Sequence, residues 1–251
     1  MAALAKNWEI FGGGLPLDET VINARFLDDT GEMPPIDKIF YGKNYPTIEQ
    51  FASVIESTLT KLNLKGYKAY LNMNPLCPDF SGNACRDVDI LCRKNLLIDI
   101  DGVSDIRQPA TDEEVQQALD LALEIKAFLT EAGFPKPAIT DSGNGIHLYY
   151  HLKNFDNDKE NQNLIKRFLH CLAARYDNAT HKVDKVVHNA GRISKAIGTL
   201  AYKGEPTKER PVRTSDFISS SEGSLTPEEL IKFLEEFESV DPRVKLNGAG
   251  P

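Results

Sequence analysis

A short apolar run interrupted by two carboxylates constrains the fold of this chain more than any other segment. Residues 96–102 read Leu-Leu-Ile-Asp-Ile-Asp-Gly. In a β-strand successive side chains point to opposite faces, so Asp99 and Asp101 share one face while Ile98 and Ile100 face a core. The run therefore predicts a buried strand that presents two neighbouring carboxylates on one side of a sheet.

Two carboxylates this close repel each other unless a cation lies between them. Hard oxygen ligands suit a divalent ion such as Mg²⁺ or Mn²⁺, so the Asp99/Asp101 pair indicates a metal site. The alternative is a strand end where two solvated aspartates begin a turn at Gly102.

Capping boxes and apolar periodicity predict helices on both sides of this strand. The expected helices cover about residues 47–63, 111–133 and 159–176, with a last one from 226. Alternating or apolar runs predict strands at 67–73, 138–141 and 146–152. This mixture of helices and strands predicts an α/β or α+β domain.

A glycine-rich segment separates the last two predicted strands. Ser142-Gly143-Asn144-Gly145 has a composition that lets backbone N–H groups approach a phosphate closely. His147, Tyr149 and His151 then share one face of the following strand. A glycine-rich hairpin turn is the simpler alternative.

The charge of the chain is unevenly distributed. The 251 residues carry a net charge of −8, which by itself argues against binding to nucleic acid. Between His181 and Arg213, however, eight basic residues accompany three acidic ones, a local net charge of +5. This asymmetry predicts a strip that binds a polyanion, with a solvated charged loop as the alternative.

Several classes of protein are excluded or disfavoured. No apolar stretch is long enough to span a membrane and the N-terminus lacks the apolar core of a signal peptide, so we expect a cytoplasmic protein with no membrane partner. No G-x-x-x-x-G-K-[ST] phosphate loop occurs, which excludes a helicase within this chain. Cys77, Cys85 and Cys92 cluster without a C-x2-C pair; we expect buried, reduced thiols, and a structural Zn²⁺ site is the alternative.

Three segments, taken in order, resemble the motifs of the archaeo-eukaryotic primase superfamily, in particular its primase-polymerase branch from phages, plasmids and CRISPR-associated loci. LLIDIDG resembles the first motif and SGNGIHLYY the second. VDKVVHNAGRISKAIGTLAYKGEPTKERPVR resembles the third motif with its basic extension. The similarity runs from about Tyr67 to Arg213, which is more than half of the chain.

The resemblance implies a DNA primase-polymerase that starts and extends primers on single-stranded DNA, using nucleoside triphosphates (NTP or dNTP) and two Mg²⁺ or Mn²⁺ ions. Asp99, Asp101 and Asp184 would bind the metals and, with His147, carry catalysis. The residues implied at the incoming nucleotide are Ser142, Asn144, His147, Arg192 and Lys195. Those implied at the template, the primer or a 5′ triphosphate are Lys203, Lys208 and Arg210.

The resemblance also implies an α+β archaeo-eukaryotic primase fold, in which an RRM-like catalytic sheet has an N-terminal α/β segment packed beside it. We expect a single catalytic domain over residues 1–240, divided into that segment (1–66) and a core (67–240). Residues 241–251 form a polar tail. Because primase-polymerase domains are often fused to a helicase, the tail is a candidate linker, and a helicase is an expected partner in cis or in trans.

Two alternatives remain at this stage. Asp99-Ile100-Asp101-Gly102-Val103 also matches the nucleophile strand of a haloacid-dehalogenase-type phosphatase, in which the first Asp is phosphorylated and the second acts as acid and base. About a hundred residues precede the strand and no late acidic pair follows, which argues against this reading. The other alternative is a nucleic-acid-binding module without chemistry, although such a binder gains nothing from acidic pairs that face phosphates.

Overall fold

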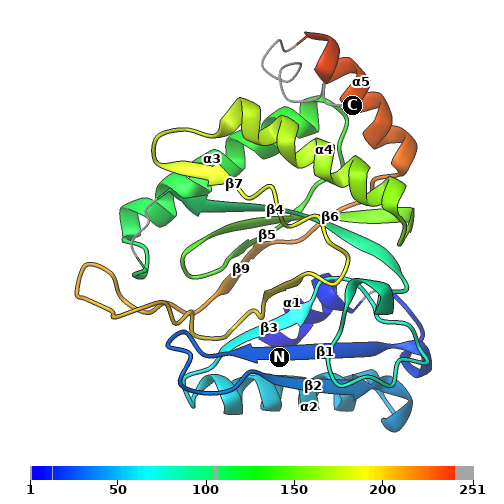
Figure 1. Cartoon of the computed structure of the whole chain (residues 1–251), viewed down its shortest axis with the longest axis vertical. Coiled ribbons are helices and arrows are strands. Elements are labelled where there is room, and N and C mark those ends of the chain that lie inside the picture. The colour runs from blue at the N-terminus through cyan, green and yellow to red at the C-terminus, as the bar shows by residue number, and fades with distance from the viewer. Residues whose placement is uncertain (1, 13, 104–106, 241–251) are drawn as a thin grey trace.

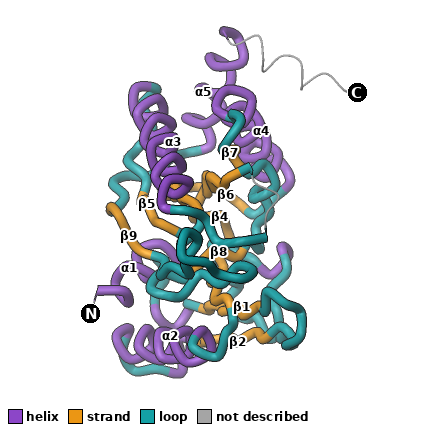
Figure 2. Tube along the Cα trace, turned by 90° about the vertical axis from the view of Figure 1, so that its left-hand side faces the viewer, coloured by secondary structure: helices purple, strands orange, loops and turns teal. Residues whose placement is uncertain are grey.

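The computed structural model describes residues 2–12, 14–103 and 107–240, and the strands of these residues form two antiparallel sheets. Figure 1 shows the two sheets one above the other, with helices on their outer sides, and Figure 2 shows the same layers after a turn of 90° about the vertical axis. The larger sheet has five strands, in the spatial order β7 (His181–Val183), β4 (Cys92–Gly102), β6 (Gly145–Asp156), β5 (Ala138–Asp141) and β9 (Asp216–Ser219). The apolar run that carries the two carboxylates is therefore a central strand.

Three helices cover the outer face of the larger sheet (Figure 1). They are α3 (Asp112–Glu131), α4 (Lys159–Tyr176) and α5 (Pro227–Val240). Leu96, Ile98 and Ile100 point to this side and are fully buried, as the alternation of the strand predicts. Asp99 and Asp101 consequently point the other way, toward the smaller sheet.

The smaller sheet contains β2 (Ile36–Tyr41), β1 (Val21–Leu27), β3 (Lys68–Asn72) and β8 (Ile193–Lys195), in that order. Helix α2 (Ile48–Asn63) covers its outer face, and α1 (Ala2–Phe11) contacts both layers. The Trp8 ring packs edge-on against Phe51 of α2 at 5.9 Å between centroids, and the Phe11 ring packs edge-on against Tyr149 of β6 at 6.0 Å. These contacts hold the two sheets together beside the face that carries the carboxylates.

The helices expected from capping and periodicity are confirmed. Thr47 caps α2 by accepting a hydrogen bond from the backbone N–H of Gln50. Thr111 and Glu114 form the full capping box of α3, each side chain accepting from the other's backbone N–H. The expected strand at 138–141 is β5, and the one expected at 146–152 is part of the longer β6.

One expected boundary does not follow the sheets. The division at residue 66 would group the strand at 67–73 with the catalytic core, but β3 pairs with β1 and β8 in the smaller sheet. The smaller sheet therefore takes strands from both sides of that boundary. The pattern also missed the first helix, three short 3-10 helices (Leu17–Glu19, Gly42–Asn44 and Asp87–Asp89), and strands β1, β2, β7, β8 and β9. The expected polar tail, 241–251, lies outside the described residues.

The cysteines only partly follow expectation. All four are free thiols, but Cys77, Cys85 and Cys92 are half-buried rather than buried, because they lie on the loop between β3 and β4 and at its end. Burial nevertheless raises the pKa of the Cys85 thiol to about 12, which keeps it protonated and unreactive. Within the described ranges, no helix is long and apolar enough to cross a membrane.

Candidate active site

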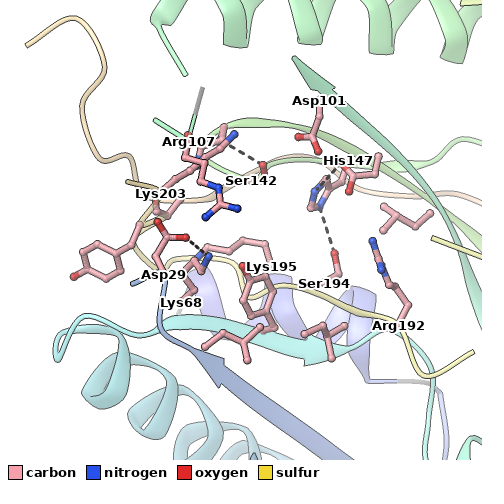
Figure 3. A pocket seen from close by; sticks show the side chains of 18 residues that line it. Asp29, Lys68, Asp101, Arg107, Ser142, His147, Arg192, Ser194, Lys195 and Lys203 are labelled. Atoms are coloured by element: carbon pink, nitrogen blue, oxygen red, sulfur yellow. Dashed lines mark hydrogen bonds and ion pairs between the residues drawn. The ribbon is translucent and has the colours of Figure 1, made fainter. Parts of the chain in front are cut away.

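A cavity of about 530 Å³ lies between the two sheets. Figure 3 shows side chains from both layers pointing into it. The residues predicted at the site that line this cavity are Asp99, Asp101, Ser142, Asn144, His147, Arg192, Lys195 and Lys203. Segments separated by up to a hundred residues in sequence therefore meet at one place.

The register of the central ladder places the carboxylates beside the histidine. Asp99 pairs with His147 across β4 and β6, and Asp101 pairs with Gly145. A Cβ atom at position 145 would lie 2.5 Å from the carbonyl oxygen of Ile100 and 2.7 Å from Oδ1 of Asp101. Glycine at this position therefore leaves the space in which the Asp101 carboxylate lies.

The two carboxylates differ in their electrostatic surroundings. Asp99 is half-buried beside the buried His147, whose Nε2 lies 3.4 Å from Asp99 Oδ1. Although burial opposes both charges, their mutual attraction prevails, so the pKa of Asp99 is lowered and that of His147 is raised. The charge of Asp99 and then burial raise the pKa of Asp101 to about 7.

These carboxylates fit a divalent cation. Oδ1 of Asp99 is buried and has no hydrogen-bond partner, and its contact to His147 is an ion pair at 3.4 Å. An unsatisfied carboxylate oxygen beside a second carboxylate that resists ionisation is an arrangement that a cation would stabilise. The donor set, two aspartates on neighbouring positions of one face, is of the hard oxygen type that Mg²⁺ and Mn²⁺ prefer.

The third predicted metal ligand is adjacent but turned away. The backbone N–H of Asp184 donates to the carbonyl of Asp99 at 2.8 Å, which places Asp184 at the edge of the same site. Its carboxylate, however, forms an ion pair with Arg192, with 3.3 Å between Oδ2 and Nη2. No three His, Cys, Asp or Glu side chains of the described residues converge as a metal-binding group, so neither the aspartate triad nor the cysteine zinc site is assembled in this structure.

The segment between β5 and β6 is a tight hairpin turn. Ser142 Oγ accepts from the backbone N–H of Gly145 at 3.0 Å, and Asp141 accepts from the N–H of Gly143 at 2.6 Å. Gly143 adopts a positive φ of 91°, and a Cβ atom there would lie 2.4 Å from Ala201. Because these N–H groups already have partners, the turn offers the cavity the side chains of Ser142 and Asn144.

Asn144 also holds neighbouring loops. Its side-chain oxygen accepts from the N–H of Ala110 at 2.9 Å, and its NH₂ group donates to the carbonyl of Ala201 at 3.4 Å. The turn thereby connects the segment before α3 to the basic region after β8. Its geometry supports a role for Asn144 in shaping the cavity wall.

The residues of the predicted basic strip fall into three groups by their surroundings. Arg192, Lys195 and Lys203 line the cavity. Lys182, Lys185 and Lys208 are exposed. Arg210 and Arg213 bind the start of α3 instead: Arg210 forms a bidentate ion pair with Glu114, at 2.7 and 2.8 Å, and Arg213 pairs with Asp112. The structure thus does not bring Lys208 and Arg210 to the cavity.

Six polar residues that line the cavity were not predicted from sequence. They are Asp29, Lys68, Tyr70, Arg107, Ser194 and Tyr202. Lys68 and Tyr70 alternate with the apolar residues of β3, so the second face of that predicted strand was a usable signal. Asp29 pairs with Lys68 and accepts from the N–H of Gly204, which ties the end of β1 to the basic region. The loop residues Asp29, Arg107 and Tyr202 carry no comparable sequence pattern.

Comparisons with known proteins place this architecture among primases. No protein-family model and no curated protein matches the sequence. Among solved structures, the chain is similar to the AEP domain of the primase-polymerase of cyanophage S-2L, with a TM-score of 0.57 and 12% identity over 92% of this chain and 96% of that one. It is also similar to primase RepB′, with a TM-score of 0.51 and 12% identity over 94% of this chain and 62% of that one. The expected α+β archaeo-eukaryotic primase fold is thereby confirmed.

Proposed function

From its archaeo-eukaryotic primase-type fold, we propose that this protein is a DNA primase-polymerase, a nucleotidyltransferase that starts and extends strands on a single-stranded DNA template. The observation that carries the proposal is the composition of one cavity, in which Asp99 and Asp101 lie together with Arg192, Lys195 and Lys203. The acidic pair suits divalent cations, and the basic side chains suit the triphosphate of an NTP or dNTP.

Each cavity residue has a role in this proposal. Two Mg²⁺ or Mn²⁺ ions held by the aspartates would neutralise phosphate charge and lower the pKa of the attacking hydroxyl. Asp184 would join Asp99 and Asp101 once Arg192 leaves it for the triphosphate. Ser142, His147, Arg192 and Lys195 would bind the nucleotide and stabilise the charge that develops on its phosphates. Asn144 would hold the wall against which the nucleotide lies.

The DNA-binding role falls to fewer residues than the sequence predicted. Lys203 at the cavity and Lys208 on the exposed tip of the basic region remain the candidates for contact with template, primer or a 5′ triphosphate. Arg210 is a weaker candidate because Glu114 and the carbonyl of Pro109 already occupy its guanidinium group. The helicase partner stays a prediction.

The phosphatase alternative loses support. It requires Asp99 to lie at the carboxyl edge of a parallel sheet, whereas β4 pairs antiparallel with both of its neighbours, β6 and β7. In α/β enzymes of the alternative type, reacting groups lie at the carboxyl edge of a parallel sheet. An aspartyl-phosphate trapping experiment would detect this chemistry if it occurred.

The proposal is tested by removing one carboxylate charge at a time. Asp99→Asn and Asp101→Asn preserve shape, and Asp156→Asn, at the exposed end of β6, is the matched control. Wild-type protein is incubated with single-stranded DNA, Mn²⁺ or Mg²⁺ and each nucleotide set, and products made without a primer are sized. We expect either site variant to lose at least about 100-fold in rate, the typical cost of losing one transition-state contact, and the control to lose little.

Wild-type synthesis by an Asp99→Asn/Asp101→Asn double variant would contradict the proposal. Calorimetry distinguishes the enzyme from a nucleic-acid-binding module without chemistry. We expect Mn²⁺ to bind the wild type and to bind neither site variant with comparable affinity. Absence of Mn²⁺ binding to the wild type would favour the module.

A further inference from the structure

Behind His147, a row of buried polar side chains connects the two sheets. Nδ1 of His147 lies 3.0 Å from the hydroxyl of Tyr149, and that hydroxyl lies 2.6 Å from Oγ of Ser194. His147 and Tyr149 belong to β6 of the larger sheet, and Ser194 belongs to β8 of the smaller one. All three are buried, Tyr149 completely. Figure 3 shows Ser194 and His147 directed toward each other across the cavity.

The orientation of a buried imidazole is decided by what each ring nitrogen meets. Nε2 of His147 faces Asp99, which requires a proton on Nε2. Nδ1 then needs a partner of its own, because a buried polar atom without a hydrogen bond is destabilising. The Tyr149 hydroxyl supplies this partner, and a hydroxyl can both donate and accept. Rotation of the ring by half a turn would lose both contacts.

We propose that Tyr149 and Ser194 are positioning residues that hold the His147 ring with Nε2 toward Asp99 and the cavity. The inference rests on the proposed function only for the catalytic role of His147; the orientation itself stands on the contacts. Ser194 lies in the same short strand as Lys195 and next to Ile193 and Arg192 in the chain. The same hydrogen bonds therefore link the orientation of His147 to the seating of the strand that carries the nucleotide-binding cations.

Either hydroxyl, that of Tyr149 or that of Ser194, can serve as the hydrogen-bond partner of Nδ1 of His147. Ser194 Oγ is itself 3.4 Å from Nδ1 of His147, so it can take over as partner when the Tyr149 hydroxyl is removed. Conversely, Ser194→Ala leaves the Tyr149 hydroxyl in place. We therefore expect Tyr149→Phe and Ser194→Ala each to lower kcat only slightly. The double variant should lower kcat by a larger factor than the two single factors multiplied together, a coupling that a double-mutant cycle measures.

Tyr150 supplies a matched control on the same strand. Its side chain points to the opposite face of β6, and its buried hydroxyl has no hydrogen-bond partner among the described residues. Tyr150→Phe thus removes a buried hydroxyl one position away without touching the row. Tyr149→Phe should fold equally well, because its ring keeps the edge-on packing against Phe11.

The test is the ¹⁵N spectrum of the imidazole rings, which reports the protonation and the hydrogen bonding of each ring nitrogen. The chain has five histidines, and His147→Gln identifies the signal of interest. All proteins are measured without metal at one fixed pH. We expect the His147 signal of the double variant to shift or to split, because the ring is no longer held in one orientation. Tyr150→Phe should keep the wild-type His147 signal. A wild-type His147 signal in the double variant overturns the proposal. If the double variant does not fold, Tyr149→Phe decides by the position of the His147 signal: a shift is expected, because the 3.0 Å contact to the Tyr149 hydroxyl is replaced by the 3.4 Å contact to Ser194, and an unshifted signal overturns the proposal.

Kinetics then separate positioning from structure. In primer extension we expect kcat of the double variant to fall about 10–100-fold, the usual effect of removing a residue that orients a catalytic group, with KM for the nucleotide changing much less. Wild-type kcat in the double variant would overturn the positioning role. If wild-type protein shows no nucleotidyl transfer while the His147 signal responds as expected, the proposed function fails and the positioning of His147 stands.

Discussion

Single residues in the cavity carry charges that the fold makes costly. Lys195 is only 7% exposed, and its Nζ donates to the carbonyl of Leu200 at 2.8 Å. Within the described part of the chain, no carboxylate lies at ion-pair distance from it. Burial, followed by the charge of Lys68, lowers the pKa of Lys195 to about 7. A buried cation without a counter-charge destabilises the folded state, and it would be stabilised by the anionic nucleotide that we propose for the cavity.

The free energy of unfolding should therefore depend on pH in a way that shows the destabilisation caused by Lys195. The folded-state pKa of Lys195 lies below its ordinary value of 10.5, so the unfolded chain binds the extra proton between about pH 7 and 10.5. The destabilisation is complete below pH 7 and disappears as the pH rises through that window, by up to about 1.4 kcal/mol per pH unit. We expect Lys195→Met to be more stable than wild type at pH 7, with the difference shrinking toward pH 10.

Urea unfolding at several pH values measures this difference. Lys208→Met, at an exposed position, is the control and should follow the wild type throughout. Parallel pH profiles for wild type and Lys195→Met would show that Lys195 is not destabilising. Lys195→Met should at the same time weaken nucleotide binding.

At the scale of elements, the start of α3 organises the basic region. Glu114 caps the helix through Thr111 and also receives the bidentate contact from Arg210. Arg213 adds a second contact at Asp112 and donates to the carbonyl of Ala110. The positive end of the helix favours carboxylates in its first turn, and these carboxylates explain why the two arginines are held there rather than directed at a phosphate.

Removal of the Arg210 side chain should therefore affect stability more than DNA binding. The hydrogen bond from Arg210, the largest cause, lowers the pKa of Glu114, so the contact stabilises the fold above that pKa and its contribution is lost as the pH falls through it. We expect Arg210→Met to lower Tm at pH 7, and the difference from wild type to shrink as the pH falls below 4.5, the ordinary pKa of a glutamate, and through the lowered pKa of Glu114. Lys203→Met should show the opposite profile, with unchanged Tm and weaker DNA binding. A larger loss of DNA binding in Arg210→Met than in Lys203→Met would restore the sequence-based assignment.

Local sequence signals predicted elements well where they were complete. The two capping boxes and apolar faces located α2 and α3, and Asp158 and Pro227 begin α4 and α5 where periodicity starts. Two of the strands that escaped prediction, β7 and β8, have three residues each. A three-residue strand has too few positions to show alternation, and its stability comes from partners distant in sequence.

At the scale of the whole molecule, the net charge of −8 does not show that the basic residues have different partners. In the basic strip, Arg192 is paired with Asp184, two further arginines are paired with α3, and the exposed basic residues are Lys182, Lys185 and Lys208. We therefore expect weak, salt-sensitive binding of single strands that strengthens with nucleotide and metal. Neutralisation of three or four phosphates gives a slope of about −2 to −3 for log K against log salt.

Fluorescence anisotropy with labelled single-stranded DNA tests this expectation between about 50 and 200 mM salt. Lys208→Ala should reduce the magnitude of the slope by about 0.7, the value for one phosphate contact, while Arg210→Met leaves it unchanged. Tight binding to DNA in high salt without metal would contradict the expectation.

The amino-acid sequence by itself determined the central strand, its two carboxylates, and the face on which His147 lies, because these follow from alternation within six or seven residues. It also determined the main helices through their caps. Only the tertiary structure decided that Ser194 and Lys195 meet β6 and β3, that Arg210 binds Glu114, and that Asp184 turns to Arg192. Those contacts join residues distant in the chain, and the energies that select them come from burial and pairing that no local pattern encodes.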